Sequence, residues 1–230
     1  MSRPVHTLAC ASLVVALLTI GCTSTTAPLT RVGSPPYEPG SGVAASVTRP
    51  LAPFTEIVAI SAVRVTLVAG ERDEAVVTTD DNLLASVVTE VRDGTLLVTV
   101  EGGIETRLLP TIALTASRPV GSFVLEASAE LTALDLDLDH LSASLSSATR
   151  LESSGRVASL ELVVTASSTA DLRNLTIETA AVSLTSASTA FARVTGAIHG
   201  ACLAGSTLHL IGSPSSQGVT TDVSSKVVLE

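Results

Sequence analysis

Hydrophobic and polar residues alternate in short runs along most of the chain, and turn-forming residues separate the runs. Residues 63–67 read Val-Arg-Val-Thr-Leu, which is the period-two pattern of a strand with one buried face. Asp93-Gly94 lies between the apolar runs 87–91 and 96–100, and this dipeptide in that position is a strong hairpin signal. Residues 54–114 are therefore predicted to form antiparallel strands and hairpins.

A short phrase then recurs five times between Ala127 and Leu210: two small residues, two variable positions and one large apolar residue. The copies lie 19 to 21 residues apart. One rung of a β-solenoid has about this length, and several rungs must stack because one rung cannot bury its own apolar face. We predict that the small pairs form corners and that the apolar endpoints form a core ladder. The pairs are Ala127-Ser128, Ser147-Ala148, Ser168-Thr169, Ala187-Ser188 and Ser206-Thr207, and the endpoints are Leu131, Leu151, Leu172, Phe191 and Leu210.

The first copy also fits a helix. Five leucines are spaced three and four residues apart, which is the stripe of an amphipathic helix: Leu131, Leu134, Leu138, Leu141 and Leu145. The stripe does not continue, because residues 160–172 and 180–191 are rich in Val, Thr and Ser and alternate with period two. The strand interpretation is therefore favoured, and the fold class predicted is all-β: N-terminal antiparallel strands followed by a parallel β-helix-like solenoid of about five rungs.

The first 22 residues have the pattern of a lipoprotein signal peptide. Arg3 supplies a positive charge, and the apolar stretch from Leu8 to Ile20 is too short for a stable membrane span. The stretch ends at Gly21-Cys22, which resembles the lipobox of bacterial lipoproteins, in which the cysteine is lipidated and becomes the mature N-terminus. The alternatives are an ordinary cleaved signal and an uncleaved anchor. Thr23, in place of an aspartate, favours the outer membrane if the cell has two membranes.

Residues 23–50 contain five prolines with many serines and threonines. Such a composition cannot bury enough apolar surface to offset the entropy of folding, so we predict a flexible tether. Residues 51–230 are long enough for a single domain with its own core. The predicted organisation is thus a signal peptide, a tether and one solenoid domain.

Charge and composition exclude several classes of partner. The chain has 13 basic and 22 acidic residues and a formal net charge of −9, so it should repel nucleic acid and anionic lipid surfaces. It has no Trp, one Tyr in the predicted tether and three Phe, at positions 54, 123 and 191. The chain therefore has too few aromatic side chains to bind nucleic-acid bases or sugar rings by stacking.

Several segments together resemble a bacterial family described as putative autotransporter adhesin, head GIN domain, a domain of unknown function. They are the Phe54 to Leu67 strand, Asp80-Asp81-Asn82-Leu83-Leu84, the Asp93-Gly94-Thr95-Leu96 hairpin, the five phrases and the closing Leu210-Ile211-Gly212-Ser213-Pro214. The resemblance covers nearly all of residues 54–214 and implies antiparallel strands that lead into a parallel solenoid. It implies no catalytic residues.

The chain departs from this family at the corners, where the family usually places glycine next to serine and only Gly205 remains here. Alanine disfavours positive φ. We therefore expect either corners with ordinary backbone conformations or a coil whose shape has changed.

Asp135, Asp137 and Asp139 are the best metal candidate. Alternate residues share one strand face about 6.8 Å apart, so the three carboxylates could bind Ca²⁺ if a neighbouring rung added oxygens. We favour the alternative of a solvated strand face that discourages aggregation. Asp80-Asp81-Asn82 could be a functional acidic turn, but Asp and Asn commonly stabilise turns by bonding their own backbone.

His199, Cys202 and His209 form a second cluster. Cys10 leaves with the signal and Cys22 carries lipid, so Cys202 would be the one free thiol of the domain, without a disulfide. Its place eight residues before Leu210 matches that of Ser183 before Phe191 and suggests an outward thiol. Zinc binding and a Cys-His nucleophile pair are the functional alternatives. We favour a small packing cysteine with two surface histidines.

The function predicted from the sequence is an envelope-anchored, non-enzymatic binding or structural protein, adhesin-like, without a cofactor. Its partners would be the lipid bilayer, through acylated Cys22, and an envelope protein or glycan. Two alternatives remain open: a β-helix polysaccharide lyase or hydrolase, and an accessory or regulatory subunit of an envelope complex. Parallel β-helices often host such enzymes, but a fold alone does not imply an activity.

Overall fold

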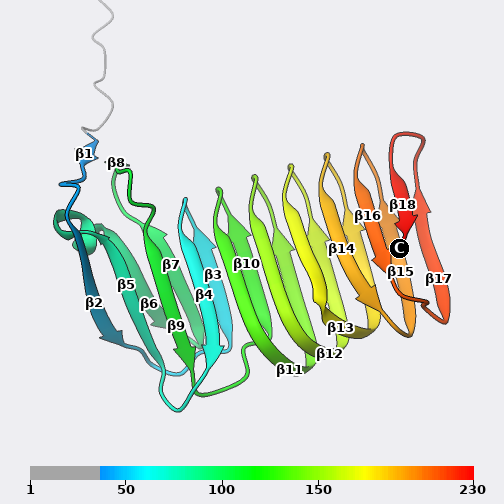
Figure 1. Ribbon diagram of the computed structural model, residues 1–230, viewed down its shortest axis with the longest axis horizontal. Coiled ribbons are helices and arrows are strands. Elements are labelled where there is room, and N and C mark those ends of the chain that lie inside the picture. Colours follow the sequence, from blue (N-terminus) through cyan, green and yellow to red (C-terminus); the bar gives the residue numbers. More distant parts are fainter. Residues whose placement is uncertain (1–36) are drawn as a thin grey trace, which may run out of the picture. The chain divides into compact units, whose positions relative to one another are not determined.

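The computed structural model describes residues 37–230, which form an all-β domain (Figure 1). The predicted signal peptide, with Cys10 and Cys22, and the first part of the predicted tether lie outside the described residues. Among residues 37–230, no helix has the length and apolar character that crossing a membrane requires.

The N-terminal part is built from short strands. Its elements are β1 (Glu38–Pro39), β2 (Ala44–Pro50), β3 (Glu56–Ile60), β4 (Arg64–Ala69), β5 (Glu74–Asp80), the 3-10 helix η1 (Asp81–Ser86), β6 (Val87–Arg92), β7 (Thr95–Val100), β8 (Ile104–Glu105) and β9 (Thr111–Ala116). β2 pairs with β5, β5 with β9, and β6 with β7, all antiparallel. The hairpin at Asp93-Gly94 and the presence of antiparallel N-terminal strands are therefore confirmed. The prediction is wrong for β3 and β4, because β3 pairs with β7 and β4 with β9 in parallel.

The remaining strands stack in parallel as a solenoid. They are β10 (Ser122–Glu126), β11 (Glu130–Leu145), β12 (Arg150–Val164), β13 (Thr169–Leu184), β14 (Thr189–Val194), β15 (Ala197–Cys202), β16 (Thr207–Ile211), β17 (Ser216–Thr221) and β18 (Lys226–Leu229). Parallel stacking begins before the sequence repeat, because β3 pairs with β10 and β4 with β11. The leucine-rich window is strand β11, so the helical alternative for residues 131–145 is wrong.

The prediction of a tether over residues 23–50 is wrong for its last part, because residues 38–39 form β1 and residues 44–50 form β2. β2 forms a ladder with β5, and the Arg49 guanidinium donates further hydrogen bonds to the carbonyl oxygens of Val87 (2.6 Å) and Leu84 (2.7 Å). Burial lowers the pKa of Arg49 from its ordinary value. β2 is therefore attached to the domain by a side chain as well as by its ladder with β5.

Asp80-Asp81-Asn82 is a structural turn. Asp80 is 1% exposed and accepts hydrogen bonds from the Gly42 amide (2.6 Å) and the Thr106 hydroxyl. The Asn82 side chain accepts from the Ser41 amide at 2.9 Å. The acidic turn therefore holds the loop before β2 against the domain.

Each sharp corner of the solenoid is a pair of residues with positive φ. The pairs are Ala127-Ser128, Ser147-Ala148, Ala166-Ser167, Ser186-Ala187 and Ala204-Gly205, with φ between 53° and 76°. The first two are the predicted corners, whereas the predicted pairs Ser168-Thr169, Ala187-Ser188 and Ser206-Thr207 lie one or two residues after the corners observed. The expectation that alanine would exclude this conformation is thus wrong. Stacking accounts for it, because each of the first four corners donates a backbone hydrogen bond of 2.9–3.0 Å to the next, which offsets the cost of the left-handed conformation. The fifth corner donates to the side chains of Asp222 and Ser224 instead.

The core ladder differs in register from the predicted one. Leu131 stacks on Leu151 as expected. In the next two coils, however, the residues at the same position of the stack are the buried Ala170 and Ala190. Phe191 follows Ala190 by one residue, and a shift of one residue turns a side chain to the opposite face of a strand. Phe191 therefore points outward, whereas the predicted endpoints Leu172 and Leu210 are buried two residues further along their strands.

Candidate ligand-binding groove

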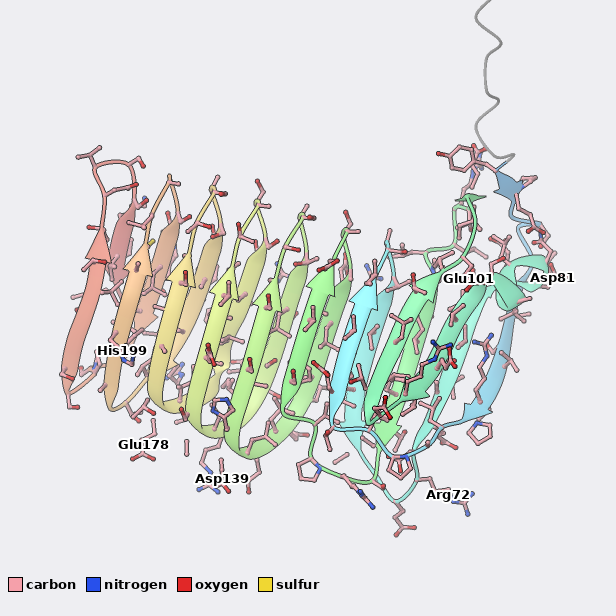
Figure 2. All side chains as sticks on the ribbon, turned by 180° about the vertical axis from the view of Figure 1, so that it is seen from behind. Arg72, Asp81, Glu101, Asp139, Glu178 and His199 are labelled. Carbon is pink, nitrogen blue, oxygen red and sulfur yellow. The ribbon has the colours of Figure 1, made fainter. Side chains whose placement is uncertain are left out.

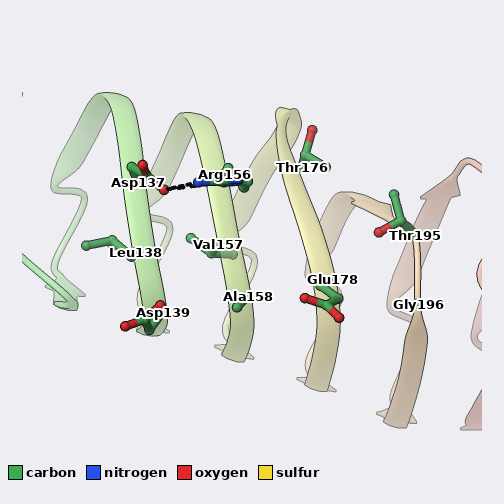
Figure 3. Close-up of a pocket in the computed structure, with 10 residues that line it drawn as sticks. All are labelled: Asp137, Leu138, Asp139, Arg156, Val157, Ala158, Thr176, Glu178, Thr195 and Gly196. Carbon is green, nitrogen blue, oxygen red and sulfur yellow. Dashed lines mark hydrogen bonds and ion pairs between the residues drawn. The ribbon is translucent and has the colours of Figure 1, made fainter.

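A groove of about 600 Å³ crosses four neighbouring coils, along the edge where the long strands bend (Figure 3). It is lined by residues 137–139 of β11, residues 156–158 of β12, Thr176 and Glu178 of β13, and Thr195 and Gly196 after β14. β11 and β12 each contain an irregularity next to this edge, between Ala133 and Leu136 and between Glu152 and Ser154. These irregularities let one strand bend and contribute a short arm to the groove.

The groove is polar and acidic. Arg156 donates a 2.8 Å hydrogen bond to Asp137 from the adjacent coil, and this carboxylate raises the pKa of Arg156. Asp139 and Glu178 are not fully buried and form no ion pair within residues 37–230. Ala158 of β12 lies between them in the stack (Figure 3). Because its side chain is a single methyl group, the space between the two carboxylates is not filled. The groove can therefore accept hydrogen bonds from a ligand that lies across the coils.

The three aspartates predicted as a metal site differ in their surroundings. Asp135 has φ 54° and lies at the bend, where its amide donates to the Ser154 hydroxyl (3.1 Å). Asp137 is paired with Arg156, and Asp139 lies further along the groove. In the part of the chain that the structure describes, no group of three His, Cys, Asp or Glu side chains is placed to hold a metal ion.

The structure separates His199, Cys202 and His209. Cys202 is fully buried, stacks on Leu184 and lies 3.7 Å from the Lys226 carbonyl oxygen. Desolvation raises the pKa of its thiol. The suggested outward thiol is therefore wrong, because the comparison with Ser183 depended on Phe191 as an inward endpoint. His199 is exposed on β15, and His209 lies on a different strand, β16.

Sequence reasoning missed a side-chain ladder on the outer face of β13, β14 and β16 that continues to the residue after β18: Asp171, Arg173, Phe191, His209 and Glu230. Arg173 donates to Asp171 (2.9 Å) and lies 4.7 Å from the Phe191 ring centre. The Phe191 and His209 rings stack at 4.4 Å, and His209 contacts Glu230 at 2.5 Å. Hydrogen bonding with Arg173 lowers the pKa of Asp171. Because these groups satisfy one another, we assign the ladder to stabilisation of the stack and regard the groove as the better binding surface.

Comparisons with known proteins agree with this architecture. A putative adhesin from Bacteroides fragilis superposes with a TM-score of 0.65 at 14% identity, over 84% of this chain and 99% of that one. A putative adhesin from Parabacteroides merdae gives 0.55 at 15%, over 84% and 99%. A putative lipid binding protein from Parabacteroides distasonis gives 0.54 at 17%, over 85% and 100%.

At these identities the solved structures establish the fold. No match was found among curated proteins. Residues 53–214 match the family described as putative auto-transporter adhesin, head GIN domain, which is the larger part of the chain. The protein therefore belongs to the head GIN domain family.

Proposed function

We propose that the protein is an adhesin-like, non-enzymatic binding protein, held at the cell envelope by acyl chains on Cys22. Its contact surface for a hydroxyl-rich ligand, such as an envelope glycan, is the groove. The observation that carries the proposal is the open pair Asp139 and Glu178 within a groove that spans four coils. Carboxylates are strong acceptors of hydrogen bonds from hydroxyl groups.

The family and the similar structures support a binding role. The family is described as an adhesin head, and two of the three similar structures named above are described as adhesins. An adhesin acts outside the cytoplasm, which agrees with the signal pattern and with Cys22 as an anchor. Two or more acyl chains hold a protein stably on a bilayer, whereas one chain binds only marginally.

Replacement of Cys22 tests the anchor. Cys22→Ser should move the protein from the membrane fraction to the soluble fraction and abolish incorporation of labelled fatty acid, because no thiol remains at the acylation position. Cys202→Ser is the matched control, since it also removes one thiol and should leave the distribution unchanged. A Cys22→Ser protein that stays with the membrane and still incorporates fatty acid would contradict the proposal. Density separation of the two membranes tests placement in the outer one.

Neutralisation of the groove tests the ligand. We expect Asp139→Asn/Glu178→Gln to weaken binding to the polysaccharide fraction of the envelope by about thirtyfold, since the loss of charge at each of two hydrogen bonds costs about 1 kcal/mol. The measurement is a binding titration with residues 22–230 carrying Cys22→Ser. Glu71→Gln/Glu161→Gln is the control, because both are exposed carboxylates away from the groove.

An equal loss in the control would show that net charge matters and the groove does not. Binding to envelope proteins alone would replace the glycan by a protein ligand. The two carboxylates also permit a polysaccharide-active enzyme, because glycoside hydrolysis uses a pair of them. Cleavage products from the polysaccharide, lost in the Asp139→Asn/Glu178→Gln protein, would favour the enzyme over the binding protein.

A further inference from the structure

Apolar side chains gather at the end of the domain where the described chain begins. Tyr37 is 64% exposed, and Leu108 and Leu109 are each 37% exposed. Tyr37 and Leu109 line a hollow of about 530 Å³ together with Ile104 and Pro110. We call Tyr37, Ile104, Leu108 and Leu109 the N-terminal apolar patch. Nothing within residues 37–230 covers these side chains completely, so the patch is available to a partner.

Backbone and side-chain hydrogen bonds fix the patch in place. The Glu38 amide donates to the Gly103 carbonyl oxygen at 2.8 Å, which holds β1 beside β8. The Leu108 amide donates to the Thr106 hydroxyl at 2.9 Å, and Thr106 in turn donates to the buried Asp80. The loop that carries the leucines is thus attached to the domain. Its apolar side chains are presented to solvent from an ordered backbone.

The position of the patch along the chain indicates its partner. Tyr37 lies fifteen residues after Cys22, and a chain of that length reaches at most about 50 Å. Acyl chains on Cys22 would therefore keep the patch near the bilayer. Tyr, Leu and Arg are the residue types found at membrane interfaces, and Arg107 lies in the same loop.

The charges around the patch decide which lipids it fits. Three acidic residues, Glu38, Glu101 and Glu105, are exposed beside the patch. Arg107 is the one basic residue among residues 101–110. The net negative charge should be repelled by anionic headgroups and tolerated by zwitterionic ones.

Figure 2 shows Glu101 at this end of the domain, whereas Asp139 and Glu178 lie along the opposite margin.

We propose that the N-terminal apolar patch inserts into the surface of a zwitterionic lipid bilayer and orients the domain there. This proposal rests on the lipid anchor proposed above. With the patch on the membrane, the groove lies at the opposite margin of the domain and faces away from the bilayer. The patch thus adds a second, non-covalent contact to the acyl anchor and presents the groove to ligands outside.

The test uses residues 22–230 with Cys22→Ser, so that no acyl chain contributes. Because the chain has no Trp, Tyr37→Trp supplies a single fluorescent reporter within the patch. We expect its emission to shift to shorter wavelength with phosphatidylcholine vesicles, and the protein to float with them. Leu108→Ser/Leu109→Ser should weaken vesicle binding by about tenfold, because two partly exposed leucines lose their transfer into lipid. Replacement of a third of the lipid by phosphatidylglycerol should weaken binding as well.

Val68→Ser/Leu134→Ser is the matched control. These residues are 39% and 38% exposed, similar to Leu108 and Leu109. Val68 pairs with Thr115 near the end of β9, and Leu134 lines the same hollow as Val68, whereas the patch precedes the start of β9. The control should bind vesicles like the parent protein. Absence of vesicle binding, or an equal loss in both double variants, would overturn the proposal. The Cys22→Ser fractionation tests the lipid anchor separately. The binding titration with the polysaccharide fraction tests the groove separately, because it contains no vesicles.

Discussion

Gly155→Ala is expected to lower the free energy of unfolding by about 3–5 kcal/mol, because it introduces both backbone strain and a clash between coils. Gly155 has φ +116°, a conformation that L side chains rarely adopt. A Cβ atom there would lie 2.5 Å from the Leu136 amide nitrogen and closer still to the Leu136 carbonyl oxygen. Both groups belong to the backbone of the adjacent coil, so neither can move without disturbing the stack.

Gly205→Ala is the matched control for this prediction. Gly205 has φ +76° with no atom within 4 Å of an added Cβ, and alanine already occupies the equivalent corner position at Ala148 and Ala187. We expect a cost of about 1 kcal/mol. Urea unfolding followed by circular dichroism measures both variants, because the chain has no Trp. Equal costs would show that φ alone matters and that the approach of the coils does not.

Phe123→Ala is expected to cost about 3–5 kcal/mol, as is usual for removal of a fully buried phenyl ring. Phe123 lies on β10 with no exposed surface, between Ile57 on β3 and Ala143 on β11. It therefore joins the N-terminal strands to the solenoid, and its loss leaves a cavity at that junction. The same unfolding measurement applies.

Phe191→Ala tests the register of the ladder with the same change of side chain. Phe191 points outward and contacts Arg173 and His209, so its loss should cost only about 1 kcal/mol. If Phe191 were an inward endpoint of the repeat, both substitutions would cost the same. Equal losses in the two variants would therefore contradict the register described above.

Local sequence patterns were sufficient to predict those elements whose residues lie close together along the chain. Asp93-Gly94 predicted the β6–β7 hairpin, and the alternation of residues 63–67 predicted β4 with Val65 and Leu67 buried. The period near twenty predicted the parallel stack. The turn interpretation of Asp80-Asp81-Asn82 also agrees with the structure. β2, by contrast, is held by its ladder with β5 and by Arg49 contacts with Leu84 and Val87, which no local pattern indicates.

The ladder and the thiol could not be placed from the phrase alone. Small residues stand both at the corners and just after them, for example Ala187 at a corner and Ser188 buried beyond it. The phrase can therefore slide by one or two residues without a local conflict. A slip of one residue reverses the direction of a side chain, which is why the phrase places Phe191 inward and suggests an outward thiol at Cys202. The favoured interpretation of Cys202 as a packing cysteine agrees with its burial.

The sequence by itself determined an all-β fold, the approximate length of each coil and a domain with few aromatic contacts, because alternation and period are local properties of the chain. Only the tertiary structure decided the register of the ladder, the left-handed corners and the groove. The physical reason is the same for all three. Each depends on backbone hydrogen bonds and packing between coils about twenty residues apart, so Asp139 and Glu178 line one groove only when the coils are stacked.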